Sequence, residues 1–459
     1  MLILLTKNKH YFFLLLLHAL IAGLGVISRF YIIGWFYLVI ITSAVWVIKP
    51  KSIDNPLSFF IAYLASMELI GRVVAASPYI PYETSKYGMF IMLLYGIIVQ
   101  QFNKGFKGYL LLLLLAPAFF IDLSGDVTRR DLIFNLLGPV NVALSVIYFS
   151  GQKFSEQGWI NILRLIFYAM FMVLIYVFIK TPDYDQLNFR LGSNFAVSGG
   201  FGTNQVSTVL GLGMFLCFLF YINKWALTGY RLLDLFLIFA FAFQGLLTFS
   251  RGGVLIAFIG ILSLFLLQGN TALTASALRK IKYLIPATLL LLISFQVANN
   301  LTGGKLYLRY KGETEGTLAG VKEKDINAIT TNRYDIFRGD AELFFQYPIW
   351  GVGAAASRYM RPNQEGIITH VELSRLLAEH GLFGILYFLI ILHFGLKLYK
   401  KSNKFFYANI RFALYIIAFG TTFHAATRTF VTPLLFGLSM VDILHFNELK
   451  ENEQLKKDA

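Results

Sequence analysis

Long apolar runs separated by short polar segments make up most of the chain. A helix needs roughly 17–25 apolar residues to cross a bilayer, and a spanning segment must be helical because lipid cannot satisfy open backbone groups. Fourteen runs are candidates for such helices. They lie near 11–27, 30–48, 57–75, 88–101, 108–121, 132–150, 159–179, 203–222, 232–249, 252–268, 281–298, 382–398, 409–426 and 430–445. Since three of them are short, the sequence predicts an all-α, polytopic transmembrane bundle of 12–14 spans.

One polar stretch is much longer than the other connections and runs over 299–381, between the eleventh and twelfth apolar runs. Its first half, 302–331, is rich in Gly, Lys, Glu and Thr and has no apolar period, which indicates a flexible flap. Its second half has apolar residues at helical spacing over 333–347. The chain is therefore expected to form a single transmembrane domain, 1–459, with one long loop that contains short amphipathic helices.

A second amphipathic helix is expected near the end of this loop. Thr369 and Glu372 have the spacing of a capping box, and Gly381 is a natural C-terminal cap. On this helix Glu372, Arg375 and Glu379 are expected to form a salt-bridged face in solvent. The sequence thus predicts a helix over 369–380, with Thr369 as its N-cap.

The charged residues give the orientation. Only 14% of the residues are charged, against about 25% in a soluble domain. In the short loops, twenty Lys and Arg residues fall on one side and eight on the other, and positive residues mark the cytoplasmic side. Both termini are therefore expected in the cytoplasm and the 299–381 loop outside. The net charge of +15 is then a topology signal, and membrane lipids rather than nucleic acid are the expected surroundings.

Arg251 is the first candidate for chemistry. It lies between two apolar runs with almost no loop, where a charge is costly and usually has a partner or a role. One alternative is an interfacial arginine whose side chain reaches the lipid headgroups. The neighbouring Gly252 and Gly253 favour a binding role, because they are expected to open space beside the guanidinium.

His370 is the second candidate. As the first residue after the expected N-cap, it would lie at the positive end of a helix, which disfavours imidazolium. A neutral imidazole is a competent general base near neutral pH, although a surface histidine without a task is an open alternative. His424, near the outer end of its span, is the next candidate. A lone histidine on an apolar helix is more often a packed core residue.

Three further arginines, Arg190, Arg333 and Arg338, are expected on the same outer side. Arginines with a histidine suit a phosphate-bearing ligand, because arginine binds phosphate through two parallel hydrogen bonds. A sugar hydrolase would instead need two paired carboxylates. No set of residues has metal-ligand spacing, and the single cysteine, Cys217, cannot form an intramolecular disulfide. No metal or cofactor is therefore expected.

Four segments occur in an order that resembles the O-antigen ligase and polymerase superfamily. They are Ser250-Arg-Gly-Gly253 at the start of a span, 333–343 with its leading Arg333, 348–353 with Gly351 and Gly353, and 370–384 with its leading His370. The resemblance covers about 190–440. Family members usually have His-Asn or His-Ser where this chain has His370-Val371, which leaves the subfamily open.

The resemblance implies a membrane glycosyltransferase of the GT-C type in a bacterial inner membrane. Its donor would be a glycan on undecaprenyl diphosphate at the periplasmic face. By this resemblance, Arg190 and Arg251 would hold the diphosphate, Arg333 matches the arginine that opens the loop helix, and His370 would activate an acceptor hydroxyl. Arg333 and Arg338 are also expected to bind substrate, because they add positive charge on the same side. The acceptor would be lipid A-core for a ligase or a second lipid-linked glycan for a polymerase. A transporter of small anions is the third alternative.

Overall fold

The protein is almost entirely helical. The computed structural model describes residues 2–46, 51–100, 106–183, 187–266, 275–321, 323–330, 333–362, 365–402 and 405–444. Two short strands, β1 (Lys153–Ser155) and β2 (Asp442–Leu444), pair in parallel within these ranges. The all-α membrane class predicted from the apolar runs is confirmed, while this strand pair was not predicted.

Eight helical segments among the described residues are long and apolar enough to cross a membrane. They belong to α1 (Leu2–Ile27), α2 (Arg29–Trp46), α3 (Pro56–Ser66) with α4 (Glu68–Val73), α7 (Arg129–Phe149), α8 (Glu156–Lys180), α9 (Thr203–Asn223), α12 (Ala275–Leu301) and α19 (Leu382–Ser402). Shorter helices complete the bundle. They are α5 (Thr84–Gln100), α6 (Phe106–Phe119), α10 (Arg231–Leu247), α11 (Arg251–Leu266), α20 (Phe406–Thr422) and α21 (Val431–Ser439).

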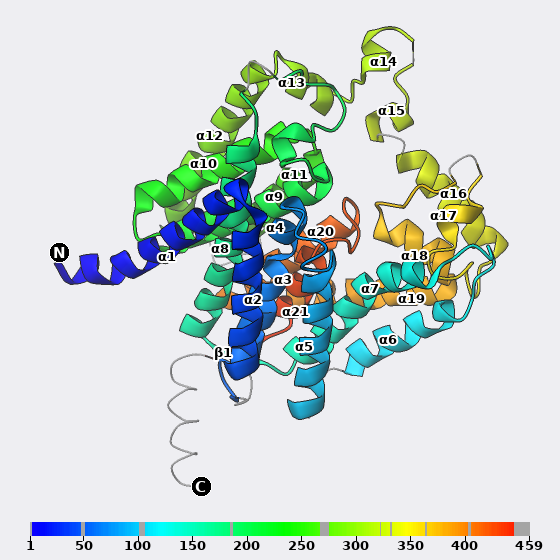
Figure 1. The fold of residues 1–459 in the computed structure, drawn as a ribbon, viewed down its shortest axis with the longest axis horizontal. Coiled ribbons are helices and arrows are strands. Elements are labelled where there is room, and N and C mark those ends of the chain that lie inside the picture. The colour runs from blue at the N-terminus through cyan, green and yellow to red at the C-terminus, as the bar shows by residue number, and fades with distance from the viewer. Residues whose placement is uncertain are drawn as a thin grey trace.

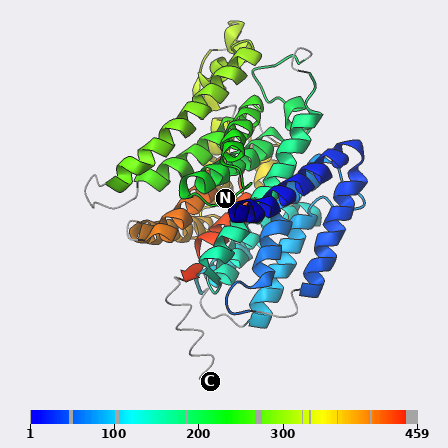
Figure 2. The ribbon, with the colours of Figure 1, turned by 90° about the vertical axis from the view of Figure 1, so that its left-hand side faces the viewer.

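The helices fall into an inner and an outer set. In the apolar window of α9, 83% of the residues are buried, against 28% for α2 and 12% for α12. Figure 2 shows α2 (blue) and α12 (yellow-green) on opposite flanks of the bundle. Large apolar side chains on α12 face outward, with Ile285 at 61% and Leu292 at 60% exposure. Such a surface is stable in lipid, so the outer set is the part of the bundle that contacts the membrane.

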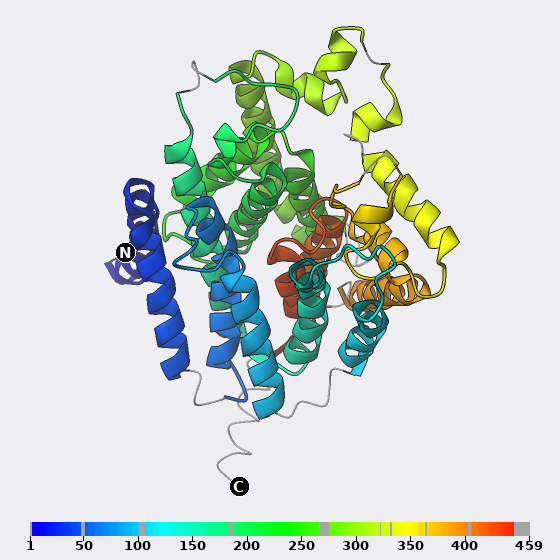
Figure 3. The same cartoon turned by 45° about the vertical axis from the view of Figure 1, so that its right-hand side comes forward.

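The last predicted span, 430–445, takes a different form. Its helix α21 has nine residues, about 14 Å at 1.5 Å per residue, and β2 follows it. All nine residues are buried, and α21 packs against α7 and α20 in the middle of the bundle (Figure 3). The segment is apolar because protein surrounds it, and by itself it is too short to cross a bilayer.

The long polar loop is more ordered than the sequence suggested. Its first half was predicted to be a flap, but it contains three short helices, α13 (Lys305–Tyr310), α14 (Glu315–Leu318) and α15 (Ile326–Thr330). Its second half contains α16 (Arg333–Gln346), as predicted, then α17 (Ser357–Met360) and α18 (Glu372–His380). A glycine turn precedes α17, with φ of 70° at Gly351 and 101° at Gly353. The loop therefore packs as a helical cap.

One predicted inner segment and one predicted outer segment lie at opposite ends of the molecule. β1 lies near the bottom of Figure 1 and α13 at the top.

In a Cys217→Ala background, we expect a membrane-impermeant maleimide to label Lys311→Cys from outside intact cells, because this exposed residue lies in the cap. Lys400 is also exposed and belongs to the predicted cytoplasmic side, so Lys400→Cys should react only after permeabilisation. If only Lys400→Cys were labelled in intact cells, the predicted orientation would be wrong.

Candidate functional site

A cationic cavity lies between the helical cap and the ends of α9, α11 and the 423–430 loop. It has a volume of about 360 Å³, within the usual range of about 300–1,000 Å³ for small-molecule sites. We call it the arginine cavity. Arg251, Arg309, Arg333, His370 and His424 line it, together with Ser193, Asn204, Phe249, Ser250, Gly252, Ile336 and Ile367. None of these described lining residues is acidic.

Arg251 reaches the cavity through a strained turn between α10 and α11. Phe249 adopts a φ of 59°, a left-handed conformation that costs a bulky residue energy. Its ring is buried and stacks on Phe189 with centroids 5.9 Å apart. The turn is fixed to the start of α9, since Ser207 donates from Oγ to the carbonyl of Ser250 over 2.7 Å. Arg251 can therefore begin a new helix directly after α10 ends.

The glycine pair beside Arg251 has a different role from the one predicted. A Cβ at Gly253 would lie 2.2 Å from the carbonyl oxygen of Ser207, and one at Gly252 would lie 2.3 Å from the ring of His424. The two glycines thus let α11 pack closely against α9 and His424, as small residues do between membrane helices. They do not open space beside the guanidinium; they fix where α11 begins.

Three guanidinium groups share the arginine cavity. Nη1 of Arg251 donates to the carbonyl of Arg309 over 3.2 Å. Burial, with the charges of Arg251 and Arg333, lowers the pKa of Arg309 to about 10. Burial and the charge of Arg251 also lower the pKa of Arg333. Nε of Arg309 is buried and has no hydrogen-bond partner among the described residues. These groups repel one another, so an anion that binds between them would be strongly stabilised.

Two helix ends add to the positive potential. α9 begins at Thr203 and α11 at Arg251, and Asn204 and Arg251 both line the cavity. The first peptide N–H groups of a helix lack intrahelical partners and carry a partial positive charge. A smaller cavity of about 180 Å³ shares Ser193, Asn204 and His370 with the arginine cavity and continues to Arg428. The positive potential of both cavities favours an anionic ligand.

His370 lies before α18 and not within it. The helix begins at Glu372, and its N-cap, Val371, makes no side-chain cap, so the predicted capping box of Thr369 and Glu372 is wrong. Thr369 instead contacts Asp340 and Arg361, through distances of 3.2 Å and 3.0 Å from its Oγ1. The helix dipole therefore cannot account for a neutral His370.

Other groups keep His370 neutral. Burial, followed by the charges of Arg428 and Arg333, lowers its pKa to about 3. Nη1 of Arg428 lies 3.2 Å from Nδ1 of His370, and its Nη2 donates to the carbonyl of Thr369 over 2.6 Å. A guanidinium has no acceptor, so Nδ1 must accept in this pair and the proton resides on Nε2. The lone pair that a general base needs is thus held by Arg428.

A buried ionic cluster contacts the backbone of Arg428. Arg72 pairs with Glu68, four residues earlier on α4, over 2.7 Å. It also pairs with Glu83, and Lys86 lies near both carboxylates. Nη1 of Arg72 donates to the carbonyl of Arg428 over 3.3 Å and to Gln205 on α9 over 3.0 Å. This cluster therefore fixes the backbone that carries Arg428 relative to the start of α9.

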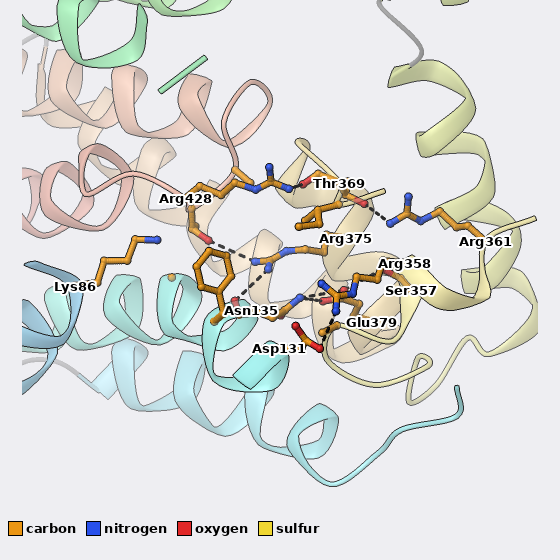
Figure 4. Close-up of a pocket in the computed structure, with 16 residues that line it drawn as sticks. Lys86, Asp131, Asn135, Ser357, Arg358, Arg361, Thr369, Arg375, Glu379 and Arg428 are labelled. Carbon is orange, nitrogen blue, oxygen red and sulfur yellow. Dashed lines mark hydrogen bonds and ion pairs between the residues drawn. The ribbon is translucent and has the colours of Figure 1, made fainter. Parts of the chain in front are cut away.

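A second charged cavity has Thr369 and Arg428 in its lining (Figure 4). Its volume is about 40 Å³, room for little more than water. Three of its four arginines are paired with carboxylates, Arg358 with Asp131 over 2.7 Å, Arg361 with Asp340 over 2.9 Å and Arg375 with Glu372. We call it the ionic cleft. The arginine cavity is the better ligand site, because it is larger and its described lining contains no carboxylate.

The predicted solvent face of α18 forms one wall of this cleft. Glu372, Arg375 and Glu379 are all buried. Arg375 pairs with Glu372, and Glu379 accepts from Asn135 over 3.0 Å and from Ser357 over 2.9 Å. The prediction of a salt bridge on this stripe is confirmed, but the prediction that the stripe faces solvent is wrong. The charges hold α18 between α7 and the 423–427 loop.

Not all predicted site residues come together. Arg251, Arg333 and His370 line the arginine cavity, and so does the second-ranked His424. Arg338 is 70% exposed at its side chain and pairs with Glu342 over 3.0 Å. Arg190 is exposed, and its backbone binds the side chain of Asn194. Neither Arg338 nor Arg190 lines the cavity.

Two arginines of the site were missed. Arg309 lies in the segment expected to be a flap. One more basic residue among its lysines and tyrosines does not indicate a binding site. Arg428 was counted only as a loop charge. No protein-family model matches the chain, and no curated protein matches it either. The family that the motifs resemble therefore stays a prediction.

Proposed function

We propose that the protein transfers a glycan from undecaprenyl diphosphate to an acceptor hydroxyl in the arginine cavity. The observation that carries this proposal is a cavity lined by three arginines and two helix starts, with no acidic residue among its described lining. An electropositive site suits a ligand with several negative charges. It also suits a reaction in which negative charge develops on a departing diphosphate.

In the proposed reaction, the acceptor oxygen attacks the anomeric carbon of the donor sugar, and the bond from that carbon to the diphosphate oxygen breaks. Arg251, Arg309 and Arg333 would stabilise the diphosphate as it leaves. The leaving group is already anionic, so the chemistry does not require a general acid. His370 would take the proton of the attacking hydroxyl.

Arg428 would couple donor binding to this proton transfer. In the structure its guanidinium holds Nδ1 of His370. An incoming diphosphate is a stronger partner for a guanidinium than a neutral imidazole is. A donor phosphate that recruits Arg428 would free the lone pair of Nδ1, and neutralising the nearby positive charge would raise the basicity of His370. The base would then become competent only when donor is present.

The proposed setting is the inner membrane of a bacterium, with 12–14 spans, both termini in the cytoplasm and the helical cap in the periplasm. The first choice of acceptor is lipid A-core, as for an O-antigen ligase. A polymerase would use a second lipid-linked glycan in the same cavity. The two differ only in the acceptor, so the assay must offer both.

The test is a transfer assay with the purified full chain. A defined undecaprenyl-diphosphate glycan is supplied with either lipid A-core or a second lipid-linked glycan, with and without chelator. We expect product with one acceptor and no loss of activity in chelator, since no metal-ligand spacing was found in the sequence. Folded protein that gives product with neither acceptor, while binding and releasing a small anion across vesicles, would favour the transporter instead.

A further inference from the structure

At the opposite end of the bundle lies a second cationic cavity, which the proposed function does not use. Its volume is about 480 Å³, larger than the arginine cavity. Four cations line it, namely Lys107 on α6, Lys397 and Lys401 on α19 and Arg411 on α20. The only acidic residue in its described lining is Asp442. We call it the headgroup pocket.

The cations of the headgroup pocket are incompletely neutralised. No ion pair joins any of the four to a carboxylate among the described residues. Lys107, Lys397 and Lys401 are exposed. Arg411 donates from Nη1 to the carbonyl of Val441, while its Nε is buried without a partner in the described part of the chain. Several positive charges around one depression favour an anionic ligand.

The walls of the pocket are apolar and lead to the outer surface of the bundle. Phe106, Phe394 and Leu398 are among its lining residues. From Phe106, α6 presents Tyr109 and Leu113 at helical spacing, with exposures of 75%, 44% and 66%. These residues lie on one face of α6, next to α19 with which it packs. A molecule with its charged end in the pocket could therefore lay an apolar chain along this face.

We propose that the headgroup pocket binds the phosphate of an anionic phospholipid, whose acyl chain runs along α6. Basic pockets between membrane helices are the known type of site for acidic lipid headgroups. A soluble anion would use the same lysines but would gain nothing from the exposed face of α6. The predicted orientation places this lipid in the cytoplasmic leaflet, where the lysines of the short loops gather.

The test measures lipid binding by the purified full chain in mild detergent, using native mass spectrometry. The probes are phosphatidylglycerol, phosphatidylcholine, glycerol phosphate and inorganic phosphate. We expect binding of phosphatidylglycerol, little binding of phosphatidylcholine and no competition by the two soluble phosphates. The variant Lys397→Gln/Lys401→Gln should lose roughly 30-fold in affinity, since each lysine near anionic lipid contributes about a fivefold factor.

The matched control is Lys51→Gln/Lys224→Gln, which removes two exposed lysines of the same predicted side that do not line the pocket. It should bind phosphatidylglycerol like the original protein, and Lys397→Arg/Lys401→Arg should keep most of the affinity because it keeps the charge. Equal losses in both glutamine variants would overturn the proposal. So would equal binding of phosphatidylcholine, or full competition by inorganic phosphate.

Discussion

Replacing His370 by alanine should slow glycan transfer by about 10²–10⁴-fold, the usual contribution of a positioned general base. Donor affinity should stay near normal, because the diphosphate is expected to bind the arginines and not the imidazole. The measurement is a single-turnover transfer rate at saturating donor, beside a donor-binding isotherm. His370→Ala protein that is folded and inserted, yet transfers at the original rate, would refute the assignment. His424 would then be the next base to test.

The pH dependence of the same reaction gives a second readout of His370. A base is active when deprotonated, so the rate should fall as the pH drops through its pKa. In the free protein, burial and two arginines lower the pKa of His370 to about 3. A bound diphosphate neutralises these charges, which should raise the pKa in the complex. The acidic limb of kcat should therefore lie at higher pH than that of kcat/KM, and His370→Ala should lack it.

Replacing Arg251 by alanine should lower kcat/KM by about 10- to 150-fold. The loss of one charge-assisted contact is worth roughly 1.5–3 kcal/mol, at about 1.4 kcal/mol per decade of rate. Arg251→Lys should recover only part of the activity, since an ammonium cannot reproduce the two parallel hydrogen bonds of a guanidinium. Unlike His370→Ala, Arg251→Ala should also weaken donor binding, because Arg251 is expected to contact the diphosphate before the transfer step.

The control for Arg251 is Arg130→Ala on α7, an exposed arginine of the same predicted side that does not line the arginine cavity. It should change kcat/KM by less than about threefold, because isolated exposed charges contribute little. If Arg130→Ala and Arg251→Ala lost activity equally, the effect would reflect overall charge and not the cavity.

The sequence was sufficient where physical rules act locally. The membrane helices follow from the length of the apolar runs, and the helix over Arg333–Gln346 follows from its apolar period. Arg251 was identified because a charge between two apolar spans is costly. Each of these patterns lies within one helix or at the end of one helix, so a single stretch of sequence is enough to predict it.

The sequence failed where distant segments decide the outcome. Glu372 looked like the partner of Thr369 in a capping box, but it binds Arg375 and the backbone of Thr427. Gly253 looked like open space, but Ser207 fills it. Arg309 and Arg428 could not be identified from the local sequence. Their roles depend on the other arginines and on His370, which the fold brings beside them. The predicted neutrality of His370 had a local reason, the helix end, whereas the structure attributes it to burial and Arg428.

The most direct test of the account is to map where a lipid diphosphate binds. A donor analogue with a photoreactive group beside its diphosphate would be crosslinked to the full chain and the labelled peptides identified. We expect label at or beside the residues that line the arginine cavity, in 193–204, at 249–252, at 309, at 333–336, at 367–370 or at 424. Unlabelled donor should displace the label, and undecaprenol should not. Label confined to the ionic cleft or to the headgroup pocket, or label that unlabelled donor does not displace, would contradict the account.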